Sequence, residues 1–492
     1  MPRIVLPITG RGLALTDRVC WAVLAVAMAS AVGLILYLNR GTTFNIDELN
    51  WAFDSPELGP GDVLDPYNGH LIAVTRFLYK AILETLGVGY LPFRILGALT
   101  VALCGGLFFA VARLRVGALP ALAPTLVLLF FGSAGTFVVA PLGFNILFSI
   151  AAGLAAVLAL ERGDTRGDIA ACALIILSVA TFSTGLAFLV GVAISVLLRA
   201  DRWRRAWIFL IPLALYAVWW LWSLAQPGSA QGAIKLSNAL LIPSYVADSL
   251  AAALAAIAGL DYDFGGAASS GVIALDWGLV LAVPAVAALI LRIRRVGMSR
   301  SLWASLGTVL VFWALGALAF SIFRPPETAR YVYMGAVGAL LVATDAARGA
   351  RFSRFGVAAL FAAAAFSLAT NLALMRDSGA AIRDFADRAR AEFTAIELAR
   401  DRVDPGFVTP SALQSELRLT PRPASDFLAM IDRYGSPGFS VAELGGQSED
   451  VRENADRILA NALELRLEPS RGAGADCRGQ RGAIELAPGG AV

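Results

Sequence analysis

The sequence contains many long apolar runs with few charges, such as residues 19–38 and 117–139. A run of about 20 apolar residues crosses the hydrocarbon core of a bilayer as a helix. The whole chain is 58% hydrophobic and 16% charged, whereas about a quarter of a soluble domain is charged. The chain is therefore predicted to be an all-α, polytopic membrane protein.

Hydropathy and length place about eleven membrane spans along the chain. Their expected ranges are 19–38, 91–112, 118–136, 142–160, 168–182, 184–199, 206–224, 276–292, 302–322, 330–346 and 355–373. Arginines cluster in the five loops after residues 112, 160, 198, 291 and 347, and the positive-inside rule assigns these loops to the cytoplasm. We therefore expect an inner-membrane-type protein with an uncleaved first span, its N-terminus inside and its C-terminus outside; the family resemblance given below implies that the membrane is bacterial.

Two further apolar segments are not counted as spans. In residues 70–86, Arg76, Lys80 and Glu84 recur on one helical face, which predicts an amphipathic helix in the membrane interface. Counting residues 238–260 as a span would reverse the side of the following arginine cluster, so we expect a surface or re-entrant element there. The two short spans that meet at residues 182–185 fit either a cavity lining or a tight helical hairpin.

The composition changes after residue 374, where charges become frequent and span-length apolar runs end. We expect a transmembrane module in residues 1–374, with an outer loop at 39–90, and an extracytoplasmic domain in residues 375–492. Apolar residues at helical spacing predict an amphipathic helix over 377–402, followed by a small α/β or mixed fold. The four cysteines form no CxxC pair, so neither a disulfide framework nor a zinc site is indicated.

The outer loop opens on two adjacent carboxylates, Asp47 and Glu48, shortly after the first span. A partly desolvated carboxylate can act as a general base on a hydroxyl nucleophile. Neighbouring residues on a helix point about 100° apart, so one could face a substrate while the other anchors the loop or a metal ion. An acidic, solvated loop without a catalytic role explains the same residues about as well.

A set of basic residues is expected on the outer side, against the general trend of the chain. The basic residues are Arg76, Lys80, Arg94, Arg324 and Arg330. Tyr331, which follows the last of them, is considered with them. Arginine holds phosphate through paired hydrogen bonds and stabilises charge on a leaving phosphate. Snorkelling to lipid headgroups would explain Arg76 and Lys80 without a substrate, and Glu327 could pair with one of its neighbouring arginines.

His70 is the only histidine of the chain, and it is expected to begin the interfacial helix. There it could cap the helix or bind a substrate phosphate. The sequence contains no nucleophile elbow, P-loop, dinucleotide fingerprint or metal-ligand pair at helical spacing. Nothing in it indicates a nucleic-acid partner.

Together these features resemble the membrane glycosyltransferases of the GT-C fold, in particular the bacterial members that use sugars linked to polyprenyl phosphate. The resemblance covers one span followed by an outer loop, an interfacial helix, an arginine at the outer end of the second span, an Arg-Tyr pair entering a late span, and an extracytoplasmic C-terminal domain. The residues that carry it are Asp47-Glu48, Asn68-Gly69-His70, Phe93-Arg94 and Arg330-Tyr331. Some relatives have His-Pro-Pro where His70 is followed by Leu71-Ile72, so no subfamily is indicated.

The resemblance implies transfer of a sugar from a polyprenyl-phosphate donor to a hydroxyl of an envelope glycan, lipid or protein on the extracytoplasmic side, with inversion of the anomeric centre. Asp47 would be the general base, with Glu48 beside it, and the outer basic residues, His70 and Tyr331 would hold the lipid phosphate. No cofactor is firmly indicated. Some members need a divalent metal ion, which Asp47 and Glu48 would then hold.

Two other classes of function remain open from the sequence. A transporter or flippase of a lipid-linked or anionic solute would also be polytopic, but transporters usually carry ionisable residues at mid-membrane and inverted repeats. The predicted spans are nearly free of charge, and no repeat is evident. A non-catalytic scaffold for envelope synthesis would need none of the proposed site residues.

Overall fold

The structure is a computed structural model, and it describes residues 10–227, 234–260, 275–320, 324–409 and 421–465. These residues are almost entirely helical and contain no β-strand, only two isolated β-bridges. The chain divides into two compact units, Met1–Ala386 and Asp387–Val492. The sequence placed a boundary after residue 374, whereas the division falls inside one long helix, α16 (Arg354–Leu398). This helix joins the expected last span and the expected amphipathic helix without a break.

Within the described residues, eight helical segments are long and apolar enough to cross a membrane. They are Asp17–Leu38, Leu91–Val116, Ala118–Val139, Pro141–Glu161, Leu236–Ala258, Leu275–Val296, Arg300–Leu318 and Arg354–Leu398. Two shorter apolar helices are α9 (Thr184–Leu197) and α11 (Trp207–Ser223). The all-helical, multi-pass membrane class predicted from the sequence is confirmed, and the number of spans stays a prediction.

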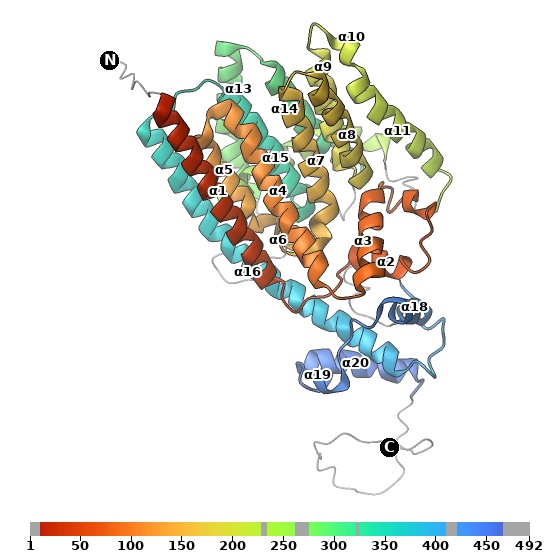
Figure 1. Cartoon of the computed structure of the whole chain (residues 1–492). Helices are drawn as coiled ribbons and strands as arrows, with labels where there is room; N and C mark the ends of the chain where they lie inside the picture. The colour runs from red at the N-terminus through yellow and green to blue at the C-terminus, as the bar shows by residue number, and fades with distance from the viewer. Residues whose placement is uncertain (1–9, 228–233, 261–274, 321–323, 410–420, 466–492) are drawn as a thin grey trace, which may run out of the picture. The chain divides into compact units, whose positions relative to one another are not determined.

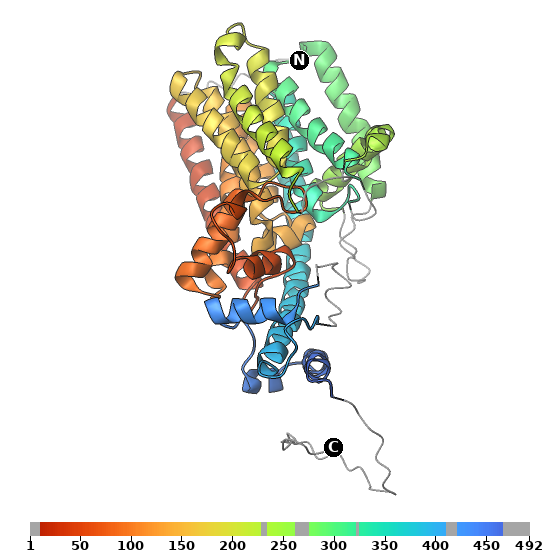
Figure 2. The same cartoon turned by 90° about the vertical axis from the view of Figure 1, so that its right-hand side faces the viewer.

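The first unit is a bundle in which most long helices run roughly parallel or antiparallel to one another (Figures 1 and 2). Its long helices are α1 (Gly10–Leu38), α4 (Leu91–Val116), α5 (Ala118–Leu129), α7 (Phe144–Glu161), α8 (Thr165–Thr181), α13 (Leu275–Val296), α14 (Arg300–Leu318) and α15 (Ala329–Ala346). Short helical turns connect them: η2 (Gly132–Ala134), α6 (Gly135–Val139), η3 (Pro141–Gly143), α10 (Arg202–Arg205) and η4 (Leu236–Leu241).

Small residues let these helices approach closely. A Cβ on Gly132 would lie 1.8 Å from the backbone oxygen of Asn371 on α16, and one on Gly153 would lie 2.2 Å from the Phe188 ring. Close backbone approach at small residues is typical of helix packing in membranes, where apolar side chains gain little by leaving lipid. Buried hydroxyls add to it, since Thr184 donates a 2.7 Å hydrogen bond to Ser149 across α9 and α7.

Residues 238–260, expected at the surface or as a re-entrant element, lie within the bundle. They form the end of η4 and helix α12 (Ile242–Ala258), which packs against α13, α14 and α15. Ala253 joins Val309 and Trp313 in a buried apolar cluster. A row of alanines gives this helix a smooth face that fits its neighbours, and the charge rule used on the sequence does not detect such packing.

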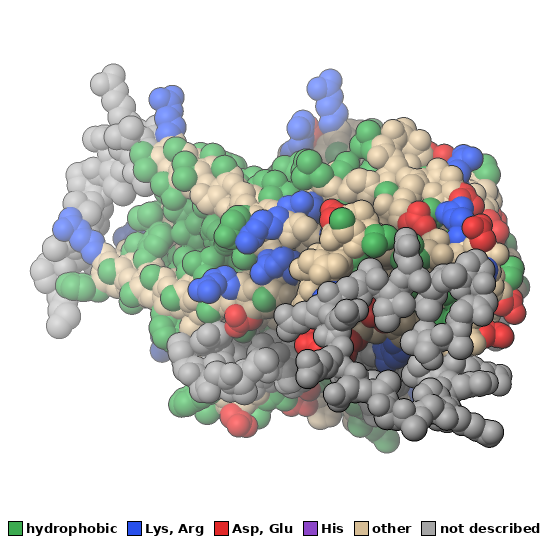
Figure 3. All heavy atoms as spheres, turned by 90° about the horizontal axis from the view of Figure 1, so that it is seen from below, with side chains coloured by type: hydrophobic (Ala, Val, Ile, Leu, Met, Phe, Trp, Pro, Cys, Tyr) green, Lys and Arg blue, Asp and Glu red, His purple; other side chains and the backbone are tan. Residues whose placement is uncertain are grey.

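Large apolar side chains are exposed on the flanks of the bundle. On α13, Trp277, Val280 and Val283 are more than half exposed. Hydrophobic side chains also cover broad areas of the surface drawn in Figure 3. Exposed apolar area of this extent would be costly in water, and it fits contact with lipid.

The second unit is built from the last turns of α16 with α18 (Ala424–Tyr434), α19 (Val441–Gly445) and α20 (Glu449–Ala462). The Thr394 hydroxyl on α16 accepts the N–H of Phe439 at 2.7 Å. The α/β or mixed fold expected for this domain is wrong for the residues that the structure describes, because they contain helices and a single bridge between Val408 and Pro423. Their apolar residues recur at helical spacing, as in the buried face of α18 formed by Phe427, Met430, Ile431 and Tyr434.

Candidate active site

The acidic pair of the outer loop begins helix α2 (Asp47–Asp54), which lies with α3 (Ala73–Leu86) at one end of the bundle (Figure 1). Tyr67 donates a 2.9 Å hydrogen bond to Oδ1 of Asp47, and Asn50 donates one of 3.1 Å to the Tyr67 hydroxyl. Burial raises the pKa of Asp47, while the Tyr67 hydrogen bond and the positive charge of Arg330 oppose this rise. A carboxylate in such a place is a stronger base than a solvated one.

A tight turn follows Tyr67 and sets the position of His70. Tyr67 and His70 exchange backbone hydrogen bonds of 3.0 and 2.9 Å. The two residues between them have positive φ angles, 49° at Asn68 and 78° at Gly69. An Asn-Gly pair with this geometry is a type I′ turn. The expectation that His70 begins the interfacial helix is wrong, because the turn ends at His70 and α3 starts only at Ala73.

His70 contacts the junction between α8 and α9. Its Nδ1 lies 2.7 Å from the Ser183 hydroxyl, and its ring packs on Phe182 with centroids 4.5 Å apart. Burial, with a smaller effect from the charges of Arg324 and Arg330, lowers the pKa of His70 to about 4. The imidazole is therefore neutral near pH 7.

The start of α15 supplies the positive charge of this region. The Arg330 guanidinium lies 5.1 Å from the centre of the Tyr331 ring. Its charge acts on both Asp47 and His70, and the charge of Arg324 also acts on His70. The fold thus brings Arg330 within electrostatic range of both Asp47 and His70, and Arg324 within range of His70, while Tyr331 lies against Arg330.

The other basic residues selected from the sequence brace the loop. Arg76 donates to the backbone oxygens of Asp62 and Asp65 at 2.9 and 2.6 Å. Lys80 donates to the backbone oxygen of Ser55 at 2.7 Å and pairs with a glutamate on its own helix. Arg94 donates to the Asn39 side chain at 2.7 Å and to the backbone oxygen of Leu36, so it ties α4 to the end of α1. In this conformation their charged ends point to carbonyl oxygens.

Glu48, the second residue of α2, is fully buried. Its two carboxyl oxygens accept hydrogen bonds from Tyr79 at 2.5 Å and Tyr90 at 2.7 Å. Burial raises the pKa of Glu48 to about 8, although both tyrosines oppose the rise. Glu48 therefore positions α2, while its neighbour Asp47 faces the cluster.

A divalent metal ion held by both acidic residues does not fit this arrangement. The Glu48 carboxyl is engaged by two tyrosines, whereas Asp47 turns toward Tyr67. Among the described residues there is also no group of three or more His, Cys, Asp or Glu side chains that could hold a metal. The chemistry proposed below uses the side chains of this chain alone.

An apolar groove of about 440 Å³ lies beside the polar cluster. Leu71, the neighbour of His70, lines it, as does Ala180, which shortly precedes the His70 contacts at the α8–α9 junction. Trp219 of α11 also lines the groove, and its Nε1 donates a 2.8 Å hydrogen bond to the backbone oxygen of Leu64 in the outer loop. The groove is thus lined by residues adjacent in sequence to His70 and to the junction that His70 contacts.

Several contributors to this site were missed in the sequence. Tyr67 and Asn50 hold Asp47, and Ser183 and Phe182 hold His70. The Asn-Gly pair was a usable signal for a turn that would bring Tyr67 next to the acidic helix. The Ser183 contact joins segments far apart in the sequence, so no local pattern reveals it.

Comparisons with known proteins give one distant similarity. No protein-family model matches the sequence, and no curated protein matches it. Among solved structures, the chain is similar to ArnT from Cupriavidus metallidurans, described as a crystal structure bound to undecaprenyl phosphate, with 13% identity and a TM-score of 0.46 over 86% of this chain and 88% of that one. At this TM-score the likeness carries no argument, so the function is argued from the residues of this chain.

Proposed function

We propose that this protein is an integral-membrane glycosyltransferase that moves a sugar from a polyprenyl-phosphate donor to a hydroxyl acceptor. The observation that carries the proposal is the buried Asp47, held by Tyr67 and within electrostatic range of Arg330, together with an apolar groove lined by the neighbour of His70. A carboxylate base, a guanidinium for a phosphate and a channel for an isoprenoid chain are the three parts that this reaction needs.

In the proposed reaction, Asp47 accepts the proton of the acceptor hydroxyl as its oxygen attacks the anomeric carbon. The bond from that carbon to the phosphate oxygen breaks, and the polyprenyl phosphate leaves with the electron pair. This single displacement inverts the anomeric centre. Asp47 is suited to this role because burial raises its pKa and the Tyr67 hydrogen bond engages Oδ1.

The leaving phosphate is stabilised by Arg330 and Arg324. Both charges converge on His70, whose neutral ring can hydrogen-bond to a phosphate oxygen without adding a charge. Oriented donors of this kind stabilise charge that develops in the transition state. The isoprenoid chain lies in the groove lined by Leu71, Ala180 and Trp219, with its phosphate at the polar cluster.

The first test is transfer by purified protein carrying Asp47→Asn. The protein is incubated in detergent with polyprenyl-phosphate-linked sugars and candidate acceptors, and mass spectrometry measures free polyprenyl phosphate and glycosylated product. We expect Asp47→Asn to lower transfer by at least roughly a hundredfold, the usual size of a general-base contribution. Glu57→Gln removes an exposed carboxylate from the same loop and is expected to keep full activity.

Full activity of folded Asp47→Asn protein would refute the assigned base. A second arm uses liposomes that contain the lipid-linked sugar. Movement of the lipid across the bilayer without any covalent product would favour the transporter and refute the transferase.

A further inference from the structure

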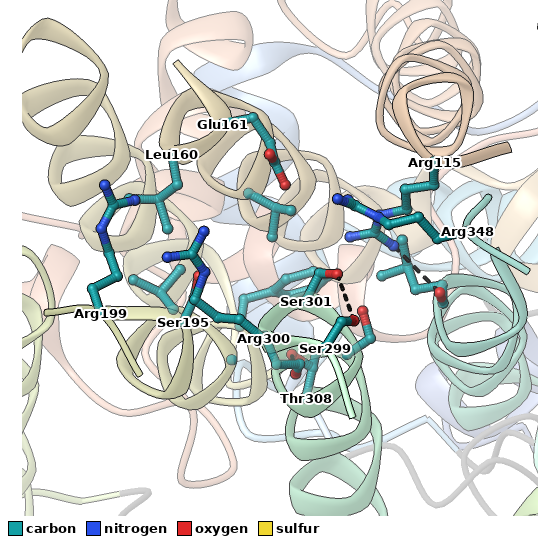
Figure 4. A pocket seen from close by; sticks show the side chains of 17 residues that line it. Arg115, Leu160, Glu161, Ser195, Arg199, Ser299, Arg300, Ser301, Thr308 and Arg348 are labelled. Carbon is teal, nitrogen blue, oxygen red and sulfur yellow. Dashed lines mark hydrogen bonds between the residues drawn. The ribbon is translucent and has the colours of Figure 1, made fainter. Parts of the chain in front are cut away.

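A second polar cavity lies at the opposite end of the bundle from the outer loop. Its volume is about 250 Å³, and Figure 4 shows it between the ends of α4, α7, α9 and α15 and the start of α14. Pockets for drug-sized ligands are larger, roughly 300–1,000 Å³, so this cavity suits a headgroup or a small anion. The labelled side chains that point into it come from Arg115, Glu161, Ser195, Arg199, Ser299, Arg300, Ser301, Thr308 and Arg348.

A buried arginine forms the floor of the cavity, and only some of its hydrogen-bond donors have partners. Arg115 pairs with Asp345 at 2.9 Å, and both side chains are almost completely buried. Ser305 donates a 2.6 Å hydrogen bond to the same aspartate. The Nε of Arg115 has no hydrogen-bond partner among the described residues. A buried donor without a partner costs free energy, so a ligand acceptor in the cavity would be stabilising.

The mouth of the cavity carries two further arginines. Arg300 and Arg348 are exposed and form no ion pair with any residue that the structure describes. Arg199 also lines the cavity, but Asp201 pairs with it at 3.0 Å. One acid, Glu161, is among the lining residues and offsets one of these charges.

Hydroxyl groups complete the lining. Ser299 and Ser301 lie 3.2 Å apart at the start of α14, and the Ser299 oxygen also accepts the N–H of Leu302. A helix start with hydroxyl groups beside it favours an anion, because the N-terminal N–H groups carry partial positive charge.

We propose that this cavity binds a phosphate group, with Arg300 and Arg348 at its mouth and Arg115 at its base. The phosphate belongs either to the headgroup of an anionic phospholipid or to a soluble phosphate. Basic pockets between membrane helices recognise lipid headgroups in this way. The site lies apart from the cluster around Asp47 and does not depend on the proposed transferase activity.

The test compares Arg300→Gln/Arg348→Gln with Arg294→Gln/Arg295→Gln. The second pair removes two exposed arginines from the end of α13 that do not line the cavity. Native mass spectrometry of each purified protein measures binding of phosphatidylglycerol, with phosphatidylcholine as the zwitterionic reference. We expect the cavity variant to bind phosphatidylglycerol at least roughly tenfold more weakly, and the α13 variant to bind it as the unaltered protein does.

Inorganic phosphate is the second probe. If it raises the melting temperature of the unaltered protein and displaces the lipid, but does neither with the cavity variant, the phosphate source is soluble. If only the lipid discriminates between the variants, the source is the phospholipid. Equal binding of both probes by the cavity variant and the unaltered protein, or an equal loss in both double variants, overturns the proposal. Melting temperatures without ligand verify that each variant is folded.

Discussion

Tyr67 donates a 2.9 Å hydrogen bond to Asp47, and the turn that follows Tyr67 leads directly to His70. One short segment therefore fixes both the proposed base and a proposed phosphate ligand. Movement of the turn at residues 67–70 would therefore displace the side chains of Asp47 and His70 together.

Tyr67→Phe is expected to lower kcat about tenfold at neutral pH, the equivalent of one hydrogen bond of roughly 1.4 kcal/mol. Without the phenol, the pKa of Asp47 rises further, so less of the carboxylate is ionised. The KM for the donor should hardly change. Steady-state kinetics measure both constants, and Tyr37→Phe, which removes an exposed hydroxyl, is the control. An unchanged kcat would show that Tyr67 does not tune the base.

Arg330→Gln is expected to raise the KM for the lipid donor roughly tenfold or more, because a charge-assisted hydrogen bond to phosphate is lost. The positive charge of Arg330 lowers the pKa of Asp47. Its removal should therefore shift the acidic limb of the pH–activity profile to higher pH. In Arg330→Lys, the acidic limb should return toward its position in the unaltered protein more fully than the KM does. Lysine keeps the positive charge but lacks the paired donors of arginine. Exposed Arg40→Gln is the control, and a pH profile that does not move would count against the contact.

Glu48→Gln is expected to change how stability depends on pH. The pKa of Glu48 is about 8 in the folded chain and 4.5 for the free group. The folded state therefore binds more protons between these values, and the free energy of unfolding falls as pH rises from about 4.5 to about 8. Glutamine cannot ionise, so the variant should lose less stability over this interval. Melting temperatures of both proteins between pH 5 and about 8.5 measure the difference, and parallel curves would contradict the assigned pKa.

Arg76→Gln is expected to loosen the outer loop. Arg76 is buried and donates to two backbone oxygens, so its loss should cost roughly 2 kcal/mol. Limited proteolysis between residues 55 and 66 should become faster, and the melting temperature should fall. Lys80→Gln should have a smaller effect, because its ion pair with Glu84 is partly exposed. A rate of cleavage equal to that of the unaltered protein would argue that Arg76 faces a ligand instead.

The sequence was sufficient for features that depend on one segment at a time. Long apolar runs predicted most of the bundle helices, and the Asp47-Glu48 pair was correctly placed in a loop between two of them. The different partners of these two side chains were also foreseeable in outline, since adjacent helical positions face different ways.

Features that depend on folding of the loop back onto itself were not predictable. Arg76 and Lys80 share a helical face, and that periodicity suggested contact with lipid or phosphate. Their hydrogen bonds go instead to backbone oxygens of residues 55, 62 and 65. Backbone acceptors of this kind leave no side-chain pattern in the sequence. The approach of Arg330 to Asp47 likewise depends on the packing of a late helix beside an early loop.

That separation along the chain has a consequence for biosynthesis. A membrane protein is made from its N-terminus onward, and its early segments can fold before later ones exist. Asp47 and His70 are translated well before Arg324 and Arg330, and they already have partners of their own in Tyr67, Ser183 and Phe182. Arg324 and Arg330 can come near Asp47 and His70 only after α15 has been synthesised and has packed into the bundle. A chain interrupted before that point would contain the proposed base but neither of the arginines proposed to hold the phosphate, so under the proposed function an incompletely translated product would be inactive.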